Sequence, residues 1–178
     1  MEGKLITFEG IDGAGKTTQI NLLKKKLNDG NIPFSIVREP GGTELSEKIR
    51  GILLDKKNMH LSSVTESLLF VSARSQLMFE KILPELNKNK IIICDRFMDS
   101  TVAYQGYGRG LDVKYLENLN FFYTYGRLPD LTIIIDIDPK DSVERMMGKK
   151  TDRMESSGFE FYCKVQKGYY EISMNASD

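Results

Sequence analysis

Short apolar runs alternate along the chain with longer stretches in which apolar residues recur every three to four positions. Four runs are rich in β-branched residues and nearly continuously hydrophobic, which is typical of parallel strands buried on both faces: Lys4–Glu9, Pro33–Val37, Lys90–Asp95 and Leu131–Asp136. Five longer segments show helical spacing: Lys16–Asp29, Thr43–Leu54, Ser62–Leu86, Val113–Tyr125 and Ser157–Ile172. This alternation predicts an α/β fold with a doubly wound parallel β-sheet flanked by helices, formed as a single domain over residues 1–178.

Three further segments lack such a pattern. The polar, glycine-containing stretch Met147–Gly158 predicts a mobile loop, and we expect a lid at about residues 146–158. The run Thr101–Gly110 is predicted to be a loop after Ala103, either closing over a ligand or lying on the surface. Ser173–Asp178 follows the last predicted helix. Since doubly wound domains usually close with another strand and helix, we expect a C-terminal βα unit to be missing here.

Composition narrows the function classes. Lysine plus arginine and aspartate plus glutamate are equal at 25 each, so no global basic field favours a nucleic-acid partner. No apolar run approaches the roughly 18 residues of a membrane span. Two distant cysteines argue against a disulfide scaffold and favour a cytoplasmic location. A single histidine, His60, argues against histidine-based catalysis or zinc binding.

The segment Phe8–Thr18, FEGIDGAGKTT, contains the frame G-x-x-x-x-G-K-T between a predicted strand and a predicted helix. In this setting glycine amides and the helix N-terminus bind phosphates, the lysine reaches the terminal phosphates, and the threonine can ligate Mg²⁺. We therefore predict a site for a nucleoside triphosphate with Mg²⁺. Its residues are Gly10, Ile11, Asp12, Gly13, Ala14, Gly15, Lys16, Thr17 and Thr18.

Several protein classes use such a loop. A GTPase would carry an Asn-Lys-x-Asp motif, whereas Asn87–Lys90 reads NKNK. A motor or regulatory ATPase would normally be longer. A small-molecule kinase needs a second site beside the loop for a phosphoryl acceptor. The acid Asp12 would repel a phosphate, so it is either irrelevant to binding or binds another group.

Two other segments provide candidates for a second site. Asp95 and Arg96 follow a predicted strand at its carboxyl end, where they can hold Mg²⁺ and a phosphate oxygen or simply form a strand-end ion pair. Glu66, Phe70 and Arg74 share one helical face. Phe70 with Arg74 can stack and hydrogen-bond a nucleobase, or be a core aromatic beside a solvated charge.

These motifs together resemble one family. FEGIDGAGKTT, Arg38–Thr43 (REPGGT), LLFVSAR, DRFMDS, AYQGYGRG and Lys149–Glu155 (KKTDRME) follow the order and spacing of thymidylate kinases, over nearly the whole chain. The resemblance implies a nucleoside monophosphate kinase fold and transfer of the γ-phosphoryl group of ATP to dTMP, giving dTDP, with Mg²⁺. It also implies a cytoplasmic homodimer with the Ser62–Leu86 helix as one contact surface.

The resemblance assigns roles residue by residue. Phe70 would stack on thymine, Arg74 would reach the thymine carbonyl or the acceptor phosphate, and Thr101 would contact the base. Tyr104, followed by Gln105, would crowd the sugar C2′ and disfavour a ribonucleotide. Asp12 would accept a hydrogen bond from the 3′-OH or order a water bound to magnesium, although a turn-stabilising role also fits Asp12. Arg96 and Arg50 would hold the acceptor phosphate, and Asp95 with Thr17 would organise magnesium.

One position departs from part of the family. Some members carry an arginine in the phosphate loop where this chain has Gly13, and the bacterial-type pattern instead places catalytic arginines in the lid. Arg153, with Lys149 and Lys150 nearby, fits that pattern, and Arg145 can contribute. The predicted catalytic groups are thus Lys16, Arg96, Arg153 and Asp95. The alternatives are a deoxynucleoside kinase and a non-enzymatic ATP-binding regulatory module.

Overall fold

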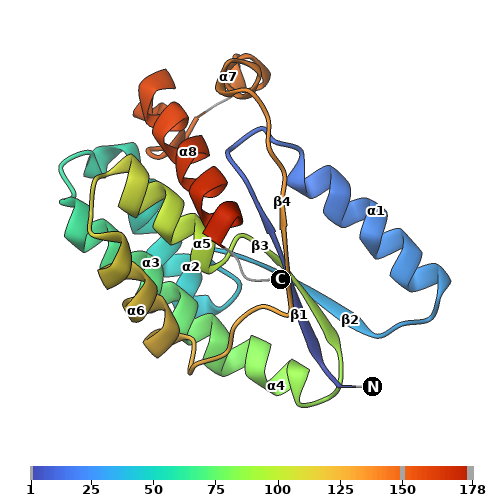
Figure 1. Cartoon of the computed structure of the whole chain (residues 1–178). Coiled ribbons are helices and arrows are strands. Elements are labelled where there is room, and N and C mark those ends of the chain that lie inside the picture. The colour runs from blue at the N-terminus through green and yellow to red at the C-terminus, as the bar shows by residue number, and fades with distance from the viewer. Residues whose placement is uncertain (1, 149–150, 176–178) are drawn as a thin grey trace.

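A four-stranded parallel sheet forms the centre of the computed structural model, which describes residues 2–148 and 151–175 (Figure 1). The strands are β1 (Lys4–Glu9), β2 (Phe34–Arg38), β3 (Ile91–Asp95) and β4 (Leu131–Ile134), in the spatial order β2-β3-β1-β4. All three strand pairs are parallel. The prediction of four parallel strands in an α/β fold is confirmed.

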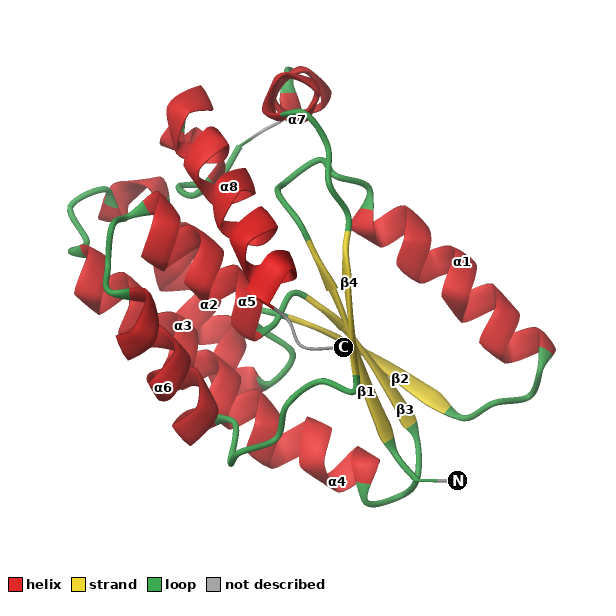
Figure 2. Ribbon diagram, in the orientation of Figure 1, coloured by secondary structure: helices red, strands yellow, loops and turns green. Residues whose placement is uncertain are grey.

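Helices lie on both faces of the sheet (Figure 2). Helix α1 (Lys16–Asp29) covers one face, and most of the others pack on the opposite face. The helices on the opposite face are α2 (Glu44–Leu54), α3 (Ser63–Leu77), α4 (Leu83–Leu86), α5 (Met98–Thr101), α6 (Val113–Tyr123) and α8 (Phe159–Asn175). Helix α7 (Pro139–Met146) lies near the carboxyl ends of the strands. Within the described residues no helix is long and apolar enough to cross a membrane.

Apolar side chains explain this layering. Ile20 and Leu27 of α1 pack with Phe8 and Ile93 on one face of the sheet. On the other face a second cluster joins strand residues such as Leu5 to the end of α3. Short polar caps set the helix starts, since Thr43 accepts a bond from the Ser46 amide and Ser62 one from the Thr65 amide, both 3.1 Å long.

The predicted single helix over residues 62–86 is interrupted. A π-helical turn, Met78–Ile82, separates α3 from α4. Pro84 has no backbone N–H for the carbonyl of Glu80, so the regular α-helical bond is lost there and a wider turn is tolerated. Strand β4 also ends at Ile134 rather than Asp136, because β1 beside it gives way to the phosphate loop after Glu9.

The prediction of a loop after Ala103 is wrong. Residues Val102–Gly108 continue α5 as a π-helical segment whose first five residues are buried. Its glycines serve close packing instead of a turn. A Cβ on Gly108 would lie 2.6 Å from the Phe161 ring, and one on Gly168 of α8 would lie 2.8 Å from the Tyr107 ring. The two helices therefore approach closely at these glycines.

The predicted lid at 146–158 is only partly loop-like. It starts at the last residue of α7 and includes a short 3₁₀ turn, Glu155–Ser157, while Arg153 and Met154 are buried. Lys149 and Lys150, predicted to support Arg153, lie outside the described residues.

Candidate active site

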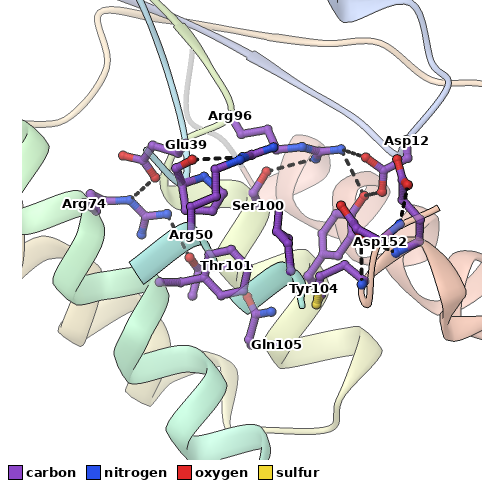
Figure 3. A pocket seen from close by; sticks show the side chains of 15 residues that line it. Asp12, Glu39, Arg50, Arg74, Arg96, Ser100, Thr101, Tyr104, Gln105 and Asp152 are labelled. Atoms are coloured by element: carbon purple, nitrogen blue, oxygen red, sulfur yellow. Dashed lines mark hydrogen bonds and ion pairs between the residues drawn. The ribbon is translucent and has the colours of Figure 1, made fainter. Parts of the chain in front are cut away.

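Two adjoining pockets lie at the carboxyl end of the sheet. The inner pocket lies among α2, α3, the helix from Met98 to Gly108 and residues 152–155 (Figure 3). The loop pocket lies along the phosphate loop and the end of β3. Four residues line both pockets, and they are the acids Asp12 and Glu39 with the arginines Arg50 and Arg96. Ligands in the two pockets would therefore meet at a group of two carboxylates and two guanidiniums.

The phosphate loop leaves β1 and ends at the first residue of α1. Gly10, Gly13 and Gly15 have φ angles of 130°, 74° and 99°, a region that favours glycine. Gly13, Gly15, Lys16 and Thr17 line the loop pocket. The side chains of Ile11 and Ala14 are instead buried in a cluster with α8, and the Thr18 amide closes the first helical turn on Gly15. Ile11 and Ala14 thus anchor the loop to the core beside α8.

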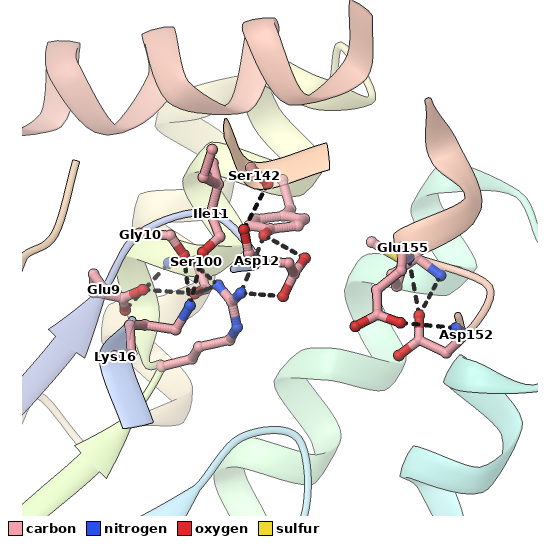
Figure 4. A network of polar contacts seen from close by, with 12 residues as sticks. Glu9, Gly10, Ile11, Asp12, Lys16, Ser100, Ser142, Asp152 and Glu155 are labelled. Atoms are coloured by element: carbon pink, nitrogen blue, oxygen red, sulfur yellow. Dashed lines mark hydrogen bonds and ion pairs between the residues drawn. The ribbon is translucent and has the colours of Figure 1, made fainter. Parts of the chain in front are cut away.

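Lys16 bends back over its own loop. Its Nζ donates to the carbonyls of Gly10 and Ile11 at 3.0 and 2.9 Å (Figure 4). Burial, and next the charge of Arg96, lower the pKa of Lys16 to about 8. A bound polyphosphate would supply the negative charge that this buried cation lacks.

The Asp12 carboxylate faces Arg96 and two tyrosines where the two pockets join. Its carboxylate accepts bonds from Arg96 Nη2 at 2.5 Å, the Tyr104 hydroxyl at 2.8 Å and the Tyr162 hydroxyl at 3.1 Å. Burial would raise the pKa of Asp12, but the charges of Arg96 and Lys16 and the two hydroxyls hold it below its ordinary value. Asp12 is thus an ionised acid that orients a cation and a tyrosine.

Arg96 follows β3 in a left-handed backbone conformation with φ of 71°, which is uncommon for a residue with a Cβ. Its Nη1 donates to the Gly10 carbonyl at 2.8 Å, and its guanidinium lies 5.0 Å from the centre of the Tyr104 ring. Glu9 holds the neighbouring turn, accepting from the Phe97 amide at 2.7 Å and the Ser100 hydroxyl at 2.6 Å (Figure 4). The strained backbone is therefore held from several sides.

Arg74 is fully buried against the inner pocket. Its donors reach Glu39 Oε2 at 2.7 Å and Thr101 Oγ1 at 2.9 Å (Figure 3). They also reach Asn120 Oδ1 at 2.6 Å and the Phe97 carbonyl at 2.9 Å. These contacts within the described chain use four of the five N–H groups of an arginine. Arg74 thus mainly orders the pocket wall and has little capacity left for a ligand.

Several other predicted second-site residues lie around the inner pocket, whereas Asp95 lies only along the loop pocket. Phe70 is half-buried on α3, one turn before Arg74, and lines the inner pocket with Thr101, Tyr104 and Gln105. Arg50 reaches from α2 and donates to the Pro40 carbonyl at 2.9 Å. Asp95 lines the loop pocket with Thr17.

The structure does not bring Arg153 to the phosphate loop, contrary to the prediction. Its guanidinium is buried, donating from Nη1 to Glu66 at 2.6 Å and from Nε to the Leu53 carbonyl at 2.6 Å. It lines neither pocket. Arg145 of α7 is the cation at the loop instead, because its Nη1 donates to the Gly13 carbonyl at 2.9 Å and its side chain lines the loop pocket.

Sequence reasoning missed several residues of the site. Glu39 lines both pockets, and burial raises its pKa to about 7 although Arg74 opposes this. Among the described residues its Oε1 has no hydrogen-bond partner. Glu39 follows β2 as Asp95 ends β3, so the argument from strand ends applies to both. Ser100, Asp152 and Glu155 also line the inner pocket; they lie within the motifs DRFMDS and KKTDRME, but the sequence assigned them no role.

Comparison with known proteins agrees with this geometry. A family model described as "Thymidylate kinase" matches residues 8–177. Thymidylate kinase of Caldanaerobacter subterraneus subsp. tengcongensis is 49% identical over 172 residues, covering 97% of this chain and 82% of the relative. The enzyme of that name from Chlorobium phaeobacteroides is 49% identical, covering 94% and 81%. The crystal structure of thymidylate kinase from Ehrlichia chaffeensis superposes with a TM-score of 0.81 at 40% identity, covering 98% of this chain and 88% of that one. With two joined pockets, a phosphate loop and these relatives, the chain belongs to the thymidylate kinase family.

Proposed function

We propose that this chain transfers the γ-phosphoryl group of ATP to the phosphate of dTMP, giving dTDP and ADP. The observation that carries the proposal is the continuity of the two pockets, which share Asp12, Glu39, Arg50 and Arg96. ATP occupies the loop pocket and dTMP the inner pocket, so that the two phosphate ends face each other across the two shared arginines.

The loop pocket suits the triphosphate of ATP. Backbone amides of the glycine loop and the start of α1 face the phosphates, and Lys16 exchanges its two carbonyl partners for phosphate oxygens. Mg²⁺ would be held by the Thr17 hydroxyl and the Asp95 carboxylate, hard oxygen donors that line the same pocket. When bound, the ion neutralises phosphate charge. Two protein ligands are enough because Mg²⁺ usually keeps waters and phosphate oxygens as its others.

The inner pocket suits a deoxynucleoside monophosphate. Phe70 stacks on thymine, and Thr101, Gln105 and the edge of Arg74 lie beside the base. Tyr104, held by Asp12 at 2.8 Å, fills the space beside the sugar C2′. Arg50 and Arg96 bind the acceptor phosphate where the pockets join.

Charge explains why these cations converge. A phosphate monoester is mostly dianionic at neutral pH, so its oxygen attacks without a general base. The obstacle is repulsion between two polyanions, since each like-charge pair near 4 Å costs about 4 kcal/mol at an effective dielectric of 20. Lys16, Arg50, Arg96 and Arg145 all line the loop pocket and offset this repulsion.

Product analysis tests the proposal. The purified chain with ATP, Mg²⁺ and dTMP should form dTDP and ADP in equal amounts, separated by anion-exchange chromatography. A deoxynucleoside kinase would instead form dTMP from thymidine, and a regulatory module would form neither product. The arginines at the pocket junction favour an acceptor that already carries a phosphate.

We further propose a homodimer that works in the cytoplasm. Both cysteines are free thiols, which suits a reducing compartment. Val64, Leu68 and Phe79, on one side of α3 and the turn after it, are 52%, 43% and 62% exposed. A second copy of the chain would cover this apolar stripe. In analytical ultracentrifugation the wild type should sediment as a dimer and the Leu68→Asp variant as a monomer. Leu22→Asp, on an exposed face of α1, should leave the dimer intact. A monomeric wild type would refute the assignment.

A further inference from the structure

Glu66 of α3 is a buried carboxylate surrounded by cations, and it lines neither pocket. It accepts bonds from Gln105 Nε2 at 2.9 Å, Arg109 Nε at 3.1 Å and Arg153 Nη1 at 2.6 Å. Burial would raise the pKa of Glu66, but the bond from Gln105 and the charge and bonds of Arg109 hold it below its ordinary value. One ionised acid therefore binds two arginines and an amide.

The three donors come from two elements beside the inner pocket, since Gln105 and Arg109 belong to the helix from Met98 and its C-terminal cap, and Arg153 belongs to residues 151–157. Gln105 itself lines the pocket, beside Tyr104 in the helix from Met98 to Gly108 (Figure 3). Arg153 lies between the pocket-lining residues Asp152 and Met154. Its backbone amide donates to the Leu54 carbonyl at 3.1 Å and its Nε to the Leu53 carbonyl at 2.6 Å. Arg153 thus ties residues 151–157, here called the lid segment, to the end of α2.

Arg109 adds a second connection to the lid segment. Its guanidinium lies 4.5 Å from the centre of the Phe161 ring of α8, and its Nη2 donates to Ser157 Oγ at 3.2 Å. The lid segment is therefore linked to Glu66 at two points, directly at Arg153 and at Ser157 through Arg109.

Stability alone is a poor reason for this arrangement, because apolar residues of similar volume often stabilise a core as well as a buried ion pair does. Geometry is the better reason, since one carboxylate determines how three pocket walls sit relative to one another. A misplacement of about 1 Å at a positioned group can cost on the order of a hundredfold in rate.

We propose that Glu66 is a positioning residue that holds the lid segment closed against the inner pocket through Arg153 and Arg109. This inference rests on the proposed transfer to dTMP. Without the carboxylate, dTMP binds a looser pocket, and water more often takes the γ-phosphoryl group of ATP in its place, giving ADP and inorganic phosphate.

The test compares Glu66→Gln, Glu66→Asp and wild type by three readouts: kcat/KM for dTMP, KM for ATP, and inorganic phosphate released per dTDP formed. Glu66→Gln should lower kcat/KM for dTMP by about 10- to 100-fold, leave KM for ATP within about twofold, and raise the share of inorganic phosphate. Glu66→Asp, which keeps the charge, should recover part of each loss. Glu85→Gln is the matched control, because Glu85 also accepts bonds from several donors, namely Ser35, Lys88 and Lys90, but none of these donors lines either pocket.

Arg153→Gln and the double variant Glu66→Gln/Arg153→Gln show whether Glu66 acts through Arg153. The double variant should match the more severe single variant within about twofold. If the fold losses in kcat/KM for dTMP of the two single variants multiply in the double variant, the proposal is wrong. It is also wrong if Glu66→Gln has wild-type dTMP kinetics and phosphate release and differs only in a lower melting temperature. If Glu66→Gln does not fold, Arg153→Gln and Arg109→Gln decide by the same readouts, and unchanged dTMP kinetics in both would refute the proposal. A wild-type chain that forms no dTDP would refute the proposed function itself.

Discussion

Phe70 offers a direct test of the base-binding assignment. Phe70→Ala removes an aromatic ring that lines the inner pocket and does not line the loop pocket. Stacking of a base on an aromatic side chain is worth about 1–3 kcal/mol by alanine substitution. At 1.4 kcal/mol for each factor of ten, the Kd for dTMP should rise about 5- to 150-fold. The Kd for ATP should stay within about twofold, because the triphosphate and its loop are untouched.

Stability must be separated from binding in this variant. Phe70 is half-buried and packs on the cluster that joins α8 to the phosphate loop. Its removal should therefore cost less than the 3–5 kcal/mol typical of a fully buried Phe→Ala change. Phe122→Ala is the control, because Phe122 is 73% exposed on α6 and lines neither pocket. Calorimetric titration with each nucleotide gives both affinities. Equal weakening of dTMP and ATP, or an unchanged dTMP affinity, would refute the stacking role.

Three other predictions concern the phosphates and the sugar. Arg145→Ala should lower kcat by about 10²–10³-fold, as loss of a transition-state donor does, with little change in dTMP affinity. A near-wild-type kcat would show that Arg145 is not the cation at the transferred phosphoryl group. Tyr104→Ala should narrow the kcat/KM preference for dTMP over its ribose counterpart, and an unchanged ratio would remove the steric role. The pKa of Lys16 is lowered to about 8 in the free chain, and the negative charge of bound ATP should raise this pKa again. The complex should therefore take up nearly one proton per ATP bound at pH 9, where free Lys16 is mostly neutral, but almost none at pH 6.5, where it is already charged. Titration calorimetry in two buffers of different ionisation enthalpy measures this uptake, and no difference between the two pH values would contradict it.

Local sequence patterns predicted the sheet and the phosphate loop well, because buried parallel strands and glycine-rich anion sites depend on residues close together in the chain. The motif resemblance also gathered Phe70, Arg96 and Tyr104 around one pocket, as the structure has them. Strand-end reasoning applied to Asp95 but was not carried to Glu39, which follows β2 in the same way.

The failures concern contacts between distant segments. Glycines in Thr101–Gly110 read as loop residues, yet Gly108 is small so that the Phe161 ring can pack on it. Arg153 lies in a motif that suggests a lid cation, but its partner Glu66 is 87 positions away. No local pattern distinguishes an arginine that faces a phosphate from one that is buried against a carboxylate. That distinction requires the tertiary packing of α2, α3 and the lid segment.

The proposed reaction requires that the inner pocket take a phosphorylated thymine nucleotide as acceptor. A coupled assay of ADP release with Mg²⁺-ATP measures this directly when dTMP, thymidine, dUMP and dCMP are compared under identical conditions. We expect dTMP to stimulate ADP release most strongly and thymidine to give no stimulation above the rate without acceptor. Faster ADP release with thymidine than with dTMP, or none that depends on dTMP, would contradict it.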